Sequence, residues 1–191
     1  KLYFNGINAG DYQAVINLKS FVGKKIGYLE AGFENVSRSP SFTFDERSAF
    51  YFLDAATDFK KENTTHLFAS YFQPRLLLRL SGNYYLVSNY MYFGEFYKPK
   101  QQEAVFNLLQ VSLEKITRLS KKWNLYTDIY VQQKAGASPV NVPLVFTRNR
   151  LALEGLFYKN LNLSTGLEVR YHTPYKADGY SPAIGQFFYQ N

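Results

Sequence analysis

The residue types that most often do chemistry are scarce in this sequence and widely spaced. The only histidines, His66 and His172, lie far apart along the chain, so no histidine cluster indicates a metal site. The absence of cysteine excludes disulfides and thiol chemistry. Acidic residues are close together at Asp45-Glu46 and at Asp54 with Asp58, but no base or nucleophile accompanies them and such groups are usually solvated. We therefore expect neither an enzyme nor a cofactor.

The positive charge does not indicate a nucleic-acid partner. The chain has 22 Lys and Arg against 15 Asp and Glu, a formal net charge of +7. Lysines alternate with aromatic residues at Tyr97-Lys98-Pro99-Lys100, as they do in many nucleic-acid-binding surfaces. The lysine pairs at 24–25, 60–61 and 121–122 nevertheless lie in expected turns and form no single stripe. No glycine-rich phosphate loop is present.

The composition favours an ordered protein without membrane-spanning helices. Aromatic residues make up 18% of the chain and charged residues 19%, which is too aromatic for disorder. The longest purely aliphatic run is Leu76–Leu78, whereas a membrane helix needs about 18 successive apolar residues. The chain has no initiator methionine or visible leader, and it ends within an expected strand. We therefore expect a fragment of a larger protein.

Alternation of apolar and polar residues predicts antiparallel β-strands. In 122–133 the odd positions are mostly apolar and the even positions are polar or tyrosine. The same period returns at 148–158 and 161–172, where one face holds every charge. Strands are also expected at 75–86 and, with a less regular pattern, at 104–115.

The connections between these strands alternate in length, which indicates an up-and-down meander. The short ones are Gln73-Pro74, 119–122 and 158–160. The long ones are 88–103, 134–147 and 173–184. The strands are about as long as the roughly 9 to 11 residues that cross a bilayer, and longer than the roughly 5 or 6 usual in soluble sheets. The pattern predicts an all-β fold, an antiparallel up-and-down transmembrane β-barrel.

The turn between the last two strands predicts their register. Opposed residues share a face, so the charged faces of 148–158 and 161–172 match only across an odd number of loop residues. Tyr158-Lys159-Asn160 supplies three, and asparagine tolerates the left-handed conformation of such turns. Arg150 then lies opposite Glu168, and we expect a cross-strand ion pair worth about 0.2 to 1 kcal/mol.

The cost of burying charge in lipid predicts which face meets the membrane. A Lys or Arg on the lipid face near the midplane costs roughly 2 to 4 kcal/mol, so the charged faces should point into the lumen. The candidate pore-lining residues are Arg79, Asn83, Asp128, Tyr130, Arg148, Arg150, Glu154, Glu168 and Arg170. The candidate lipid-facing residues are Leu76, Leu78, Leu80, Val111, Leu125, Ile129, Val131, Leu151, Leu153, Leu163 and Leu167, with Trp123, Tyr84 and Tyr171 nearer the strand ends. The arginines could favour anions.

The first third of the chain is less regular. Residues 11–21 and 26–34 are expected to form a hairpin around Gly23, whose side of the membrane the pattern does not assign. The aromatic run at 50–52 fits either a strand or a short amphipathic helix.

The end of the chain carries an ordered set of residues: Arg170 and Tyr171, Thr173-Pro174-Tyr175, Tyr180, Pro182, and Gly185-Gln186-Phe187. This segment resembles the putative porin family of Bacteroidota outer membranes. In that family an arginine and an aromatic residue precede T-P-Y, a tyrosine and a proline follow, and G-Q-F opens the next strand. Similar upstream segments are Ser39–Phe42, Ser88–Phe93, Pro99–Gln101, Leu113–Lys115 and Pro143–Asn149. After the first of these the family usually has a tryptophan, where this chain has Phe50–Leu53.

The resemblance implies an outer-membrane β-barrel larger than residues 1–191, which would form one partial domain with further strands outside it. It assigns no residue a known role. The leading hypothesis is a barrel for passive diffusion of small polar solutes, surrounded by outer-membrane lipid and lipopolysaccharide.

Two alternatives stay open. In the first, the barrel does not conduct, and the loops Tyr90–Gln101 and Thr173–Ile184 dock other envelope proteins; the same loops could also fold inward as a constriction. In the second, the chain is a soluble carbohydrate-binding β-sandwich with a solvated Asp128 face.

Overall fold

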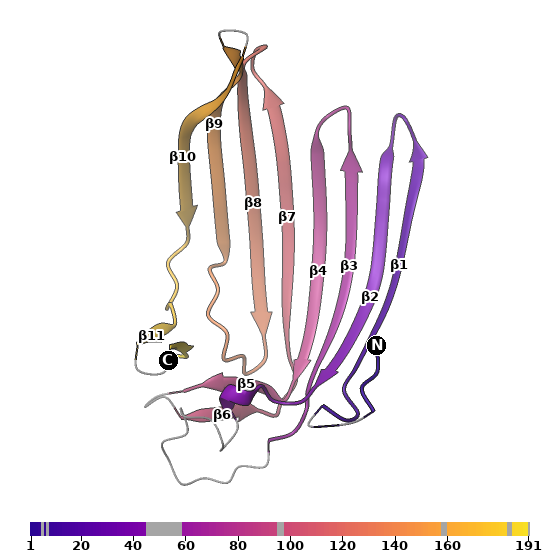
Figure 1. The fold of residues 1–191 in the computed structure, drawn as a ribbon, viewed down its shortest axis with the longest axis vertical. Helices are drawn as coiled ribbons and strands as arrows, with labels where there is room; N and C mark the ends of the chain where they lie inside the picture. The colour runs from indigo at the N-terminus through magenta and orange to yellow at the C-terminus, as the bar shows by residue number, and fades with distance from the viewer. Residues whose placement is uncertain are drawn as a thin grey trace.

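The main body of the protein is a single antiparallel sheet. The computed structural model describes residues 1–4, 6, 8–44, 59–94, 98–157, 160–182 and 185–190. Eight strands stand side by side in the order β1-β2-β3-β4-β7-β8-β9-β10 (Figure 1). Their bounds are β1 Tyr12–Gly23, β2 Gly27–Arg38, β3 Glu62–Gln73, β4 Leu78–Ser88, β7 Phe106–Arg118, β8 Trp123–Ala135, β9 Val145–Phe157 and β10 Leu161–His172.

Smaller elements lie beyond one end of this sheet (Figure 1). They are the hairpin of β5 (Tyr90–Phe93) and β6 (Pro99–Gln102), the pair of β11 (Gly179–Ser181) and β12 (Gln186–Phe188), and the 3-10 helix η1 (Phe42–Phe44). Within the described residues, no helix is long and apolar enough to span a membrane.

The up-and-down antiparallel arrangement predicted from the sequence is confirmed. Each strand of the main sheet pairs with the preceding one in the chain, except that β7 pairs with β4 across the intervening hairpin. In the described residues β1 and β10 are the two edges, and the sheet does not close on itself. The transmembrane barrel therefore remains a prediction.

In the described part of the chain, the short turns lie at one end of the sheet, and β5, β6 and β11 lie beyond the other end (Figure 1). The turn after Gly23, which the sequence left unassigned, belongs to the short-turn end together with the turns at 74–77 and 119–122. The run at 50–52, expected as a strand or helix, lies outside the described residues.

The turn between β3 and β4 corrects two expectations about the apolar side chains. The amide of Leu77 donates to the carbonyl of Pro74 at 3.4 Å, and Leu77 adopts a φ of +49°. The turn thus extends to Leu77, and Leu76 lies in it rather than on a strand. Because β4 then runs to Ser88, Tyr84 lies within the strand rather than near its end.

The pairing register separates two faces of the main sheet, because opposed residues in an antiparallel ladder point to the same side. One row joins Arg79 to Glu114, Asp128, Arg148 and Arg170 across successive strands. We call the side that carries this row the polar face, and the opposite side the apolar face.

The two faces differ sharply in charge. Every charged side chain of the eight strands except Lys115 falls on the polar face. Lys115 lies toward the short turns, opposite Leu78. The other ten expected lipid-facing positions, Leu78, Leu80, Val111, Leu125, Ile129, Val131, Leu151, Leu153, Leu163 and Leu167, all fall on the apolar face.

The apolar face has no protein cover in the described part of the chain. Its side chains include Ile16, Leu18 and Leu167, which are more than two-thirds exposed. Within the described residues, the buried apolar side chains are few and include Phe93 and Phe106, which lie near the loops rather than between two sheets. A continuous exposed apolar surface of this kind is typical of a protein that meets lipid or a partner, and the packed core of a β-sandwich is not found in the described residues.

Candidate functional site

The polar face brings all nine candidate pore-lining residues to one side of the sheet. Arg79 and Asn83 lie on β4, Asp128 and Tyr130 on β8, Arg148, Arg150 and Glu154 on β9, and Glu168 and Arg170 on β10. Their shared face follows from the register. Whether this face lines a pore stays a prediction.

The predicted register of β9 and β10 is confirmed, but the predicted ion pair is wrong. Arg150 lies opposite Glu168, and Phe157 pairs with Leu161, with three residues between them in the chain. Glu168 instead accepts hydrogen bonds from the Nε atoms of Arg148 at 2.9 Å and Arg170 at 2.6 Å. The long side chain of Arg148 reaches Glu168 as its diagonal neighbour on the adjacent strand, and Arg170 reaches it from two residues along the same strand.

Arg150 has other partners on the same face. Its guanidinium lies 4.2 Å from the centre of the Tyr126 ring and its Nη2 atom 3.8 Å from Glu154. Glu154 also accepts hydrogen bonds from Asn124 and from the Tyr126 hydroxyl, both at 2.7 Å. These groups are partly solvated, so each ion pair contributes little stability. Together, these contacts hold the side chains of a solvated surface that carries charges of both signs.

The other half of the polar face carries aromatic rings that the sequence analysis missed. The rings of Phe21 and Tyr28 lie 5.0 Å apart, and those of Tyr28 and Phe72 lie 6.3 Å apart. His66 stacks on Tyr85 at 4.2 Å. Aromatic residues occur on both faces of the first strands, so alternation alone does not separate them. A signal was available, because apolar and polar residues alternate regularly in β4. Pairing through the hairpin turn would have assigned the residues of β3 to the same two faces.

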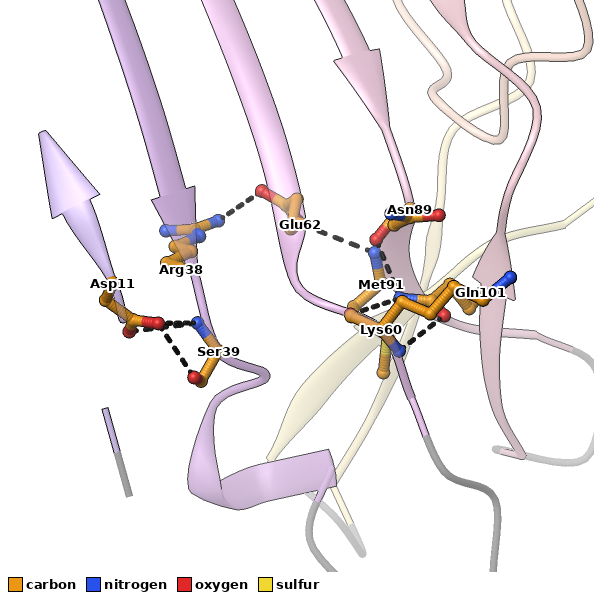
Figure 2. Close-up of polar contacts among 8 residues, drawn as sticks. All are labelled: Asp11, Arg38, Ser39, Lys60, Glu62, Asn89, Met91 and Gln101. Atoms are coloured by element: carbon orange, nitrogen blue, oxygen red, sulfur yellow. Dashed lines mark hydrogen bonds and ion pairs between the residues drawn. The ribbon is translucent and has the colours of Figure 1, made fainter. Parts of the chain in front are cut away.

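Polar contacts hold the long loops at the other end of the sheet (Figure 2). The carboxylate of Glu62, a polar-face residue, is 2.8 Å from Nη2 of Arg38 and accepts a hydrogen bond from the Met91 amide at 3.4 Å. The Gln101 side chain donates to the Lys60 carbonyl at 2.7 Å and accepts from the Lys60 amide at 3.0 Å. The β5–β6 hairpin is thereby fastened to the start of β3.

Aromatic packing joins the β5–β6 hairpin to β7, to η1 and to the end of the chain in one cluster on the polar-face side. The ring of Tyr90 meets Phe106, also a polar-face residue, edge-on at 5.6 Å. Phe93 stacks on Phe44 at 4.6 Å, and its carbonyl accepts the Tyr189 amide at 2.7 Å. Burial and the nearby Glu62 charge raise the pKa of Tyr90. The loop Tyr90–Gln101 therefore contacts Tyr189, which lies beyond the loop Thr173–Ile184. The choice between constriction and interface stays open.

Asp11 ties three segments together just outside the strands. It is 7% exposed and accepts hydrogen bonds from the Ser39 amide at 2.9 Å and from Lys61 Nζ at 2.8 Å (Figure 2 shows the Ser39 contact). Burial alone would raise the pKa of Asp11, but these hydrogen bonds outweigh it, and the pKa lies below the ordinary value of 3.8.

We expect this carboxylate to stabilise the protein only where it is ionised. Because the folded-state pKa is lowered, the contribution is complete above the ordinary pKa and disappears as the pH falls through the folded-state value. An Asp11→Asn variant should lose about 1 to 3 kcal/mol of unfolding free energy at pH 7 and match the parent at the most acidic pH. Urea unfolding of both proteins at several pH values measures this difference. A difference that does not change with pH would contradict the assignment.

Among the described residues, no group of His, Asp and Glu side chains is arranged to hold a metal ion. The site is instead an extended mixed-charge and aromatic face on an up-and-down antiparallel sheet, with short turns at one end and long packed loops at the other. These features define an all-β protein built on an up-and-down antiparallel sheet, an arrangement that β-barrel membrane proteins share.

The chain belongs to the family described as Putative porin, whose model matches residues 1–191. No curated protein and no solved structure matches the chain. The match confirms the family that the sequence resembles, without restricting it to Bacteroidota. Membership of a porin family indicates a membrane location and a non-enzymatic role.

Proposed function

We propose that the protein is an outer-membrane β-barrel through which small polar solutes diffuse passively, with the polar face lining a water-filled lumen. The observation that carries this proposal is the segregation of strand charges, all on one face except Lys115. A charge held against lipid near the midplane costs roughly 2 to 4 kcal/mol, whereas a charge in a wet lumen costs little. Solvated, mixed-sign side chains are suited to passage of polar solutes.

Further strands would complete the barrel between β10 and β1. Residues 1–191 would then be one partial domain, and the exposed backbone edges of β1 and β10 would be paired. Lipid and lipopolysaccharide would cover the apolar face, with Trp123 at the start of β8 and Tyr171 near the end of β10 in the interfacial aromatic girdles. We infer that this barrel belongs to a Bacteroidota outer membrane, and the resemblance of the segment that ends in Gly185-Gln186-Phe187 supports this location.

Ion selectivity should be weak. Basic side chains on the polar face only slightly outnumber acidic ones, and many are paired, as Arg79 is with Glu114 at 3.8 Å. Fixed charges of both signs attract ions of both signs, so a strong preference for anions is not expected.

Single-channel recording of the full-length natural protein in a planar bilayer tests the proposal. We expect stable conductance steps in the parent and, in an Arg150→Glu variant, a roughly two- to fivefold shift of the permeability ratio toward cations, because about 1 kcal/mol acts on an ion near each fixed charge. Lys24→Glu makes the same charge change in a short turn and should leave the ratio nearly unchanged.

A protein that inserts but stays silent would contradict passive diffusion and favour the second candidate, a non-conducting scaffold. The observation that favours this candidate is the packed loop cluster around Tyr90, Phe93 and Phe106 on the polar-face side. Such a cluster could block the mouth and present a surface to another envelope protein.

A further inference from the structure

The polar face is divided into an aromatic half and an ionic half. A single row of opposed residues crosses all eight strands and shows the change: Phe21, Tyr28, Phe72, Arg79, Glu114, Asp128, Arg148 and Arg170. On β1 to β3 the row is aromatic, and from β4 onward it is charged.

The rings of the aromatic half lie in sequence from the short-turn end toward the loops. We call Phe21, Tyr28, Phe72, Phe68, His66 and Tyr85 the aromatic track. Strand β3 supplies three of them on the same face, so the track follows the strand direction. His66 lies 5.1 Å from Phe68 and 4.2 Å from Tyr85, measured between ring centres.

The track leaves ring surface open. Phe21 is 54% exposed and Tyr28 is 36% exposed. The Phe68 ring lies over Gly32 of β2, where any Cβ atom would collide with it. Because Gly32 has no side chain, it leaves the space that the Phe68 ring occupies on the sheet surface.

Uncharged hydrogen-bonding groups border the track. Ser70, Ser81 and Ser112 oppose one another in the row next to Phe72, and Asn83 opposes Phe68 in the row beyond. Asn83 also contacts Nε2 of His66 at 3.0 Å.

The charges nearest the track are already engaged by protein groups. The guanidinium of Arg79 lies 5.2 Å from the centre of the Phe72 ring and 3.8 Å from Glu114. Glu30 accepts a hydrogen bond from Asn17 at 2.9 Å and lies 3.8 Å from Lys19 Nζ. Glu34 accepts a hydrogen bond from the Gln13 side chain at 2.7 Å. A solute at the track would therefore meet aromatic surface, hydroxyls and amides, together with charges that already have protein partners.

We propose that the aromatic track binds neutral saccharides within the lumen. The inference rests on the proposed function and names a solute class for the same face. One face of a pyranose ring presents C–H groups, which fit the negative face of an aromatic ring, while its hydroxyls bond to serine and amide side chains. Charged solutes lack this match and would be drawn to the ionic half instead.

Calorimetric titration of the full-length natural protein in detergent micelles with maltohexaose tests the track without requiring conduction. We expect saturable binding by the parent, roughly five- to tenfold weaker binding by Phe72→Ala, and binding close to the parent by Phe72→Tyr, which keeps the ring. Arg150→Gln changes the ionic half and should bind maltohexaose as the parent does. Sorbitol has hydroxyls but no ring face and should not bind.

Circular dichroism of each variant checks that the sheet is intact, and Tyr28→Ala replaces Phe72→Ala if the latter does not fold. Absence of saturable binding by the parent would overturn the proposal. So would equal binding by the parent and the alanine variant, or equal losses in the alanine variant and Arg150→Gln.

Recording the same preparations in a planar bilayer separates this proposal from the proposed function. A protein that conducts without binding maltohexaose would retain the diffusion function and lose the saccharide track. A protein that binds maltohexaose through Phe72 but never conducts would keep the track and lose passive diffusion.

Discussion

Arginine in place of Val111 is expected to destabilise the sheet inserted in a bilayer, whereas arginine in place of the adjacent Gln110 is expected to have little effect. Val111 is 48% exposed in the middle of β7, where it opposes Gly82 and Val131 on the apolar face. If that face meets lipid, the charge should cost roughly 2 to 4 kcal/mol. Gln110 lies on the polar face, where a wet lumen would solvate the same side chain.

Folding of both variants from urea into lipid vesicles measures this difference as a change in unfolding free energy. The pair is matched because the two positions are neighbours on one strand and receive the same new side chain. Equal stability of the two variants would mean that the apolar face does not lie in the membrane. Such a result would favour a soluble protein or a face covered by a protein partner.

Alanine in place of Gly27 should destabilise the protein by roughly 2 to 5 kcal/mol. Gly27 has a φ of +97°, which costs other residues about 1 to 3 kcal/mol. In addition, the new Cβ atom would collide with the backbone carbonyl of Phe72, and overpacking of this kind costs about 1 to 3 kcal/mol. The Gln73 side chain donates to the Lys25 carbonyl at the same place, so the two strands have little room to separate.

Gly82→Ala is the control for this prediction. No heavy atom lies within 4 Å of a Cβ built at Gly82, so alanine should be neutral or stabilise the strand by about 0.4 to 1 kcal/mol. Denaturant midpoints of both variants in vesicles provide the comparison. If Gly27→Ala proves as stable as Gly82→Ala, the turn between β1 and β2 does not pack as tightly against β3 as the structure shows.

The sequence determined the register of the last hairpin because both strands alternate cleanly and the turn has few residues. The odd number of residues in the turn was enough to place Arg150 opposite Glu168, and the structure agrees. The register does not determine side-chain rotamers, so it could not show that Glu168 bonds to Arg148 and Arg170 instead. For the same reason, the nine candidate residues could be assigned to one face without their partners.

Other features depend on contacts between distant segments, which alternation does not encode. The Gln101 amide pairs with Lys60, from a segment far along the chain, and this contact fixes where the β5–β6 hairpin lies. Leu76 looked like a strand residue because it belongs to a leucine run, yet the turn begun by Pro74 extends through Leu77. The sequence analysis missed the aromatic half because aromatic residues fall on both faces of the first strands.

The arrangement of short turns has a consequence for how the protein folds. Strands β1–β2, β3–β4, β7–β8 and β9–β10 are each joined by a short turn, so closing each pair restricts few residues. Longer segments must be ordered before β2 meets β3 and before β4 meets β7. Since rates fall as contacting residues become more distant in the chain, hairpins should form early and join slowly. The long-loop end, where Glu62 and Gln101 fasten neighbouring segments, would then be the last part of the sheet to become ordered.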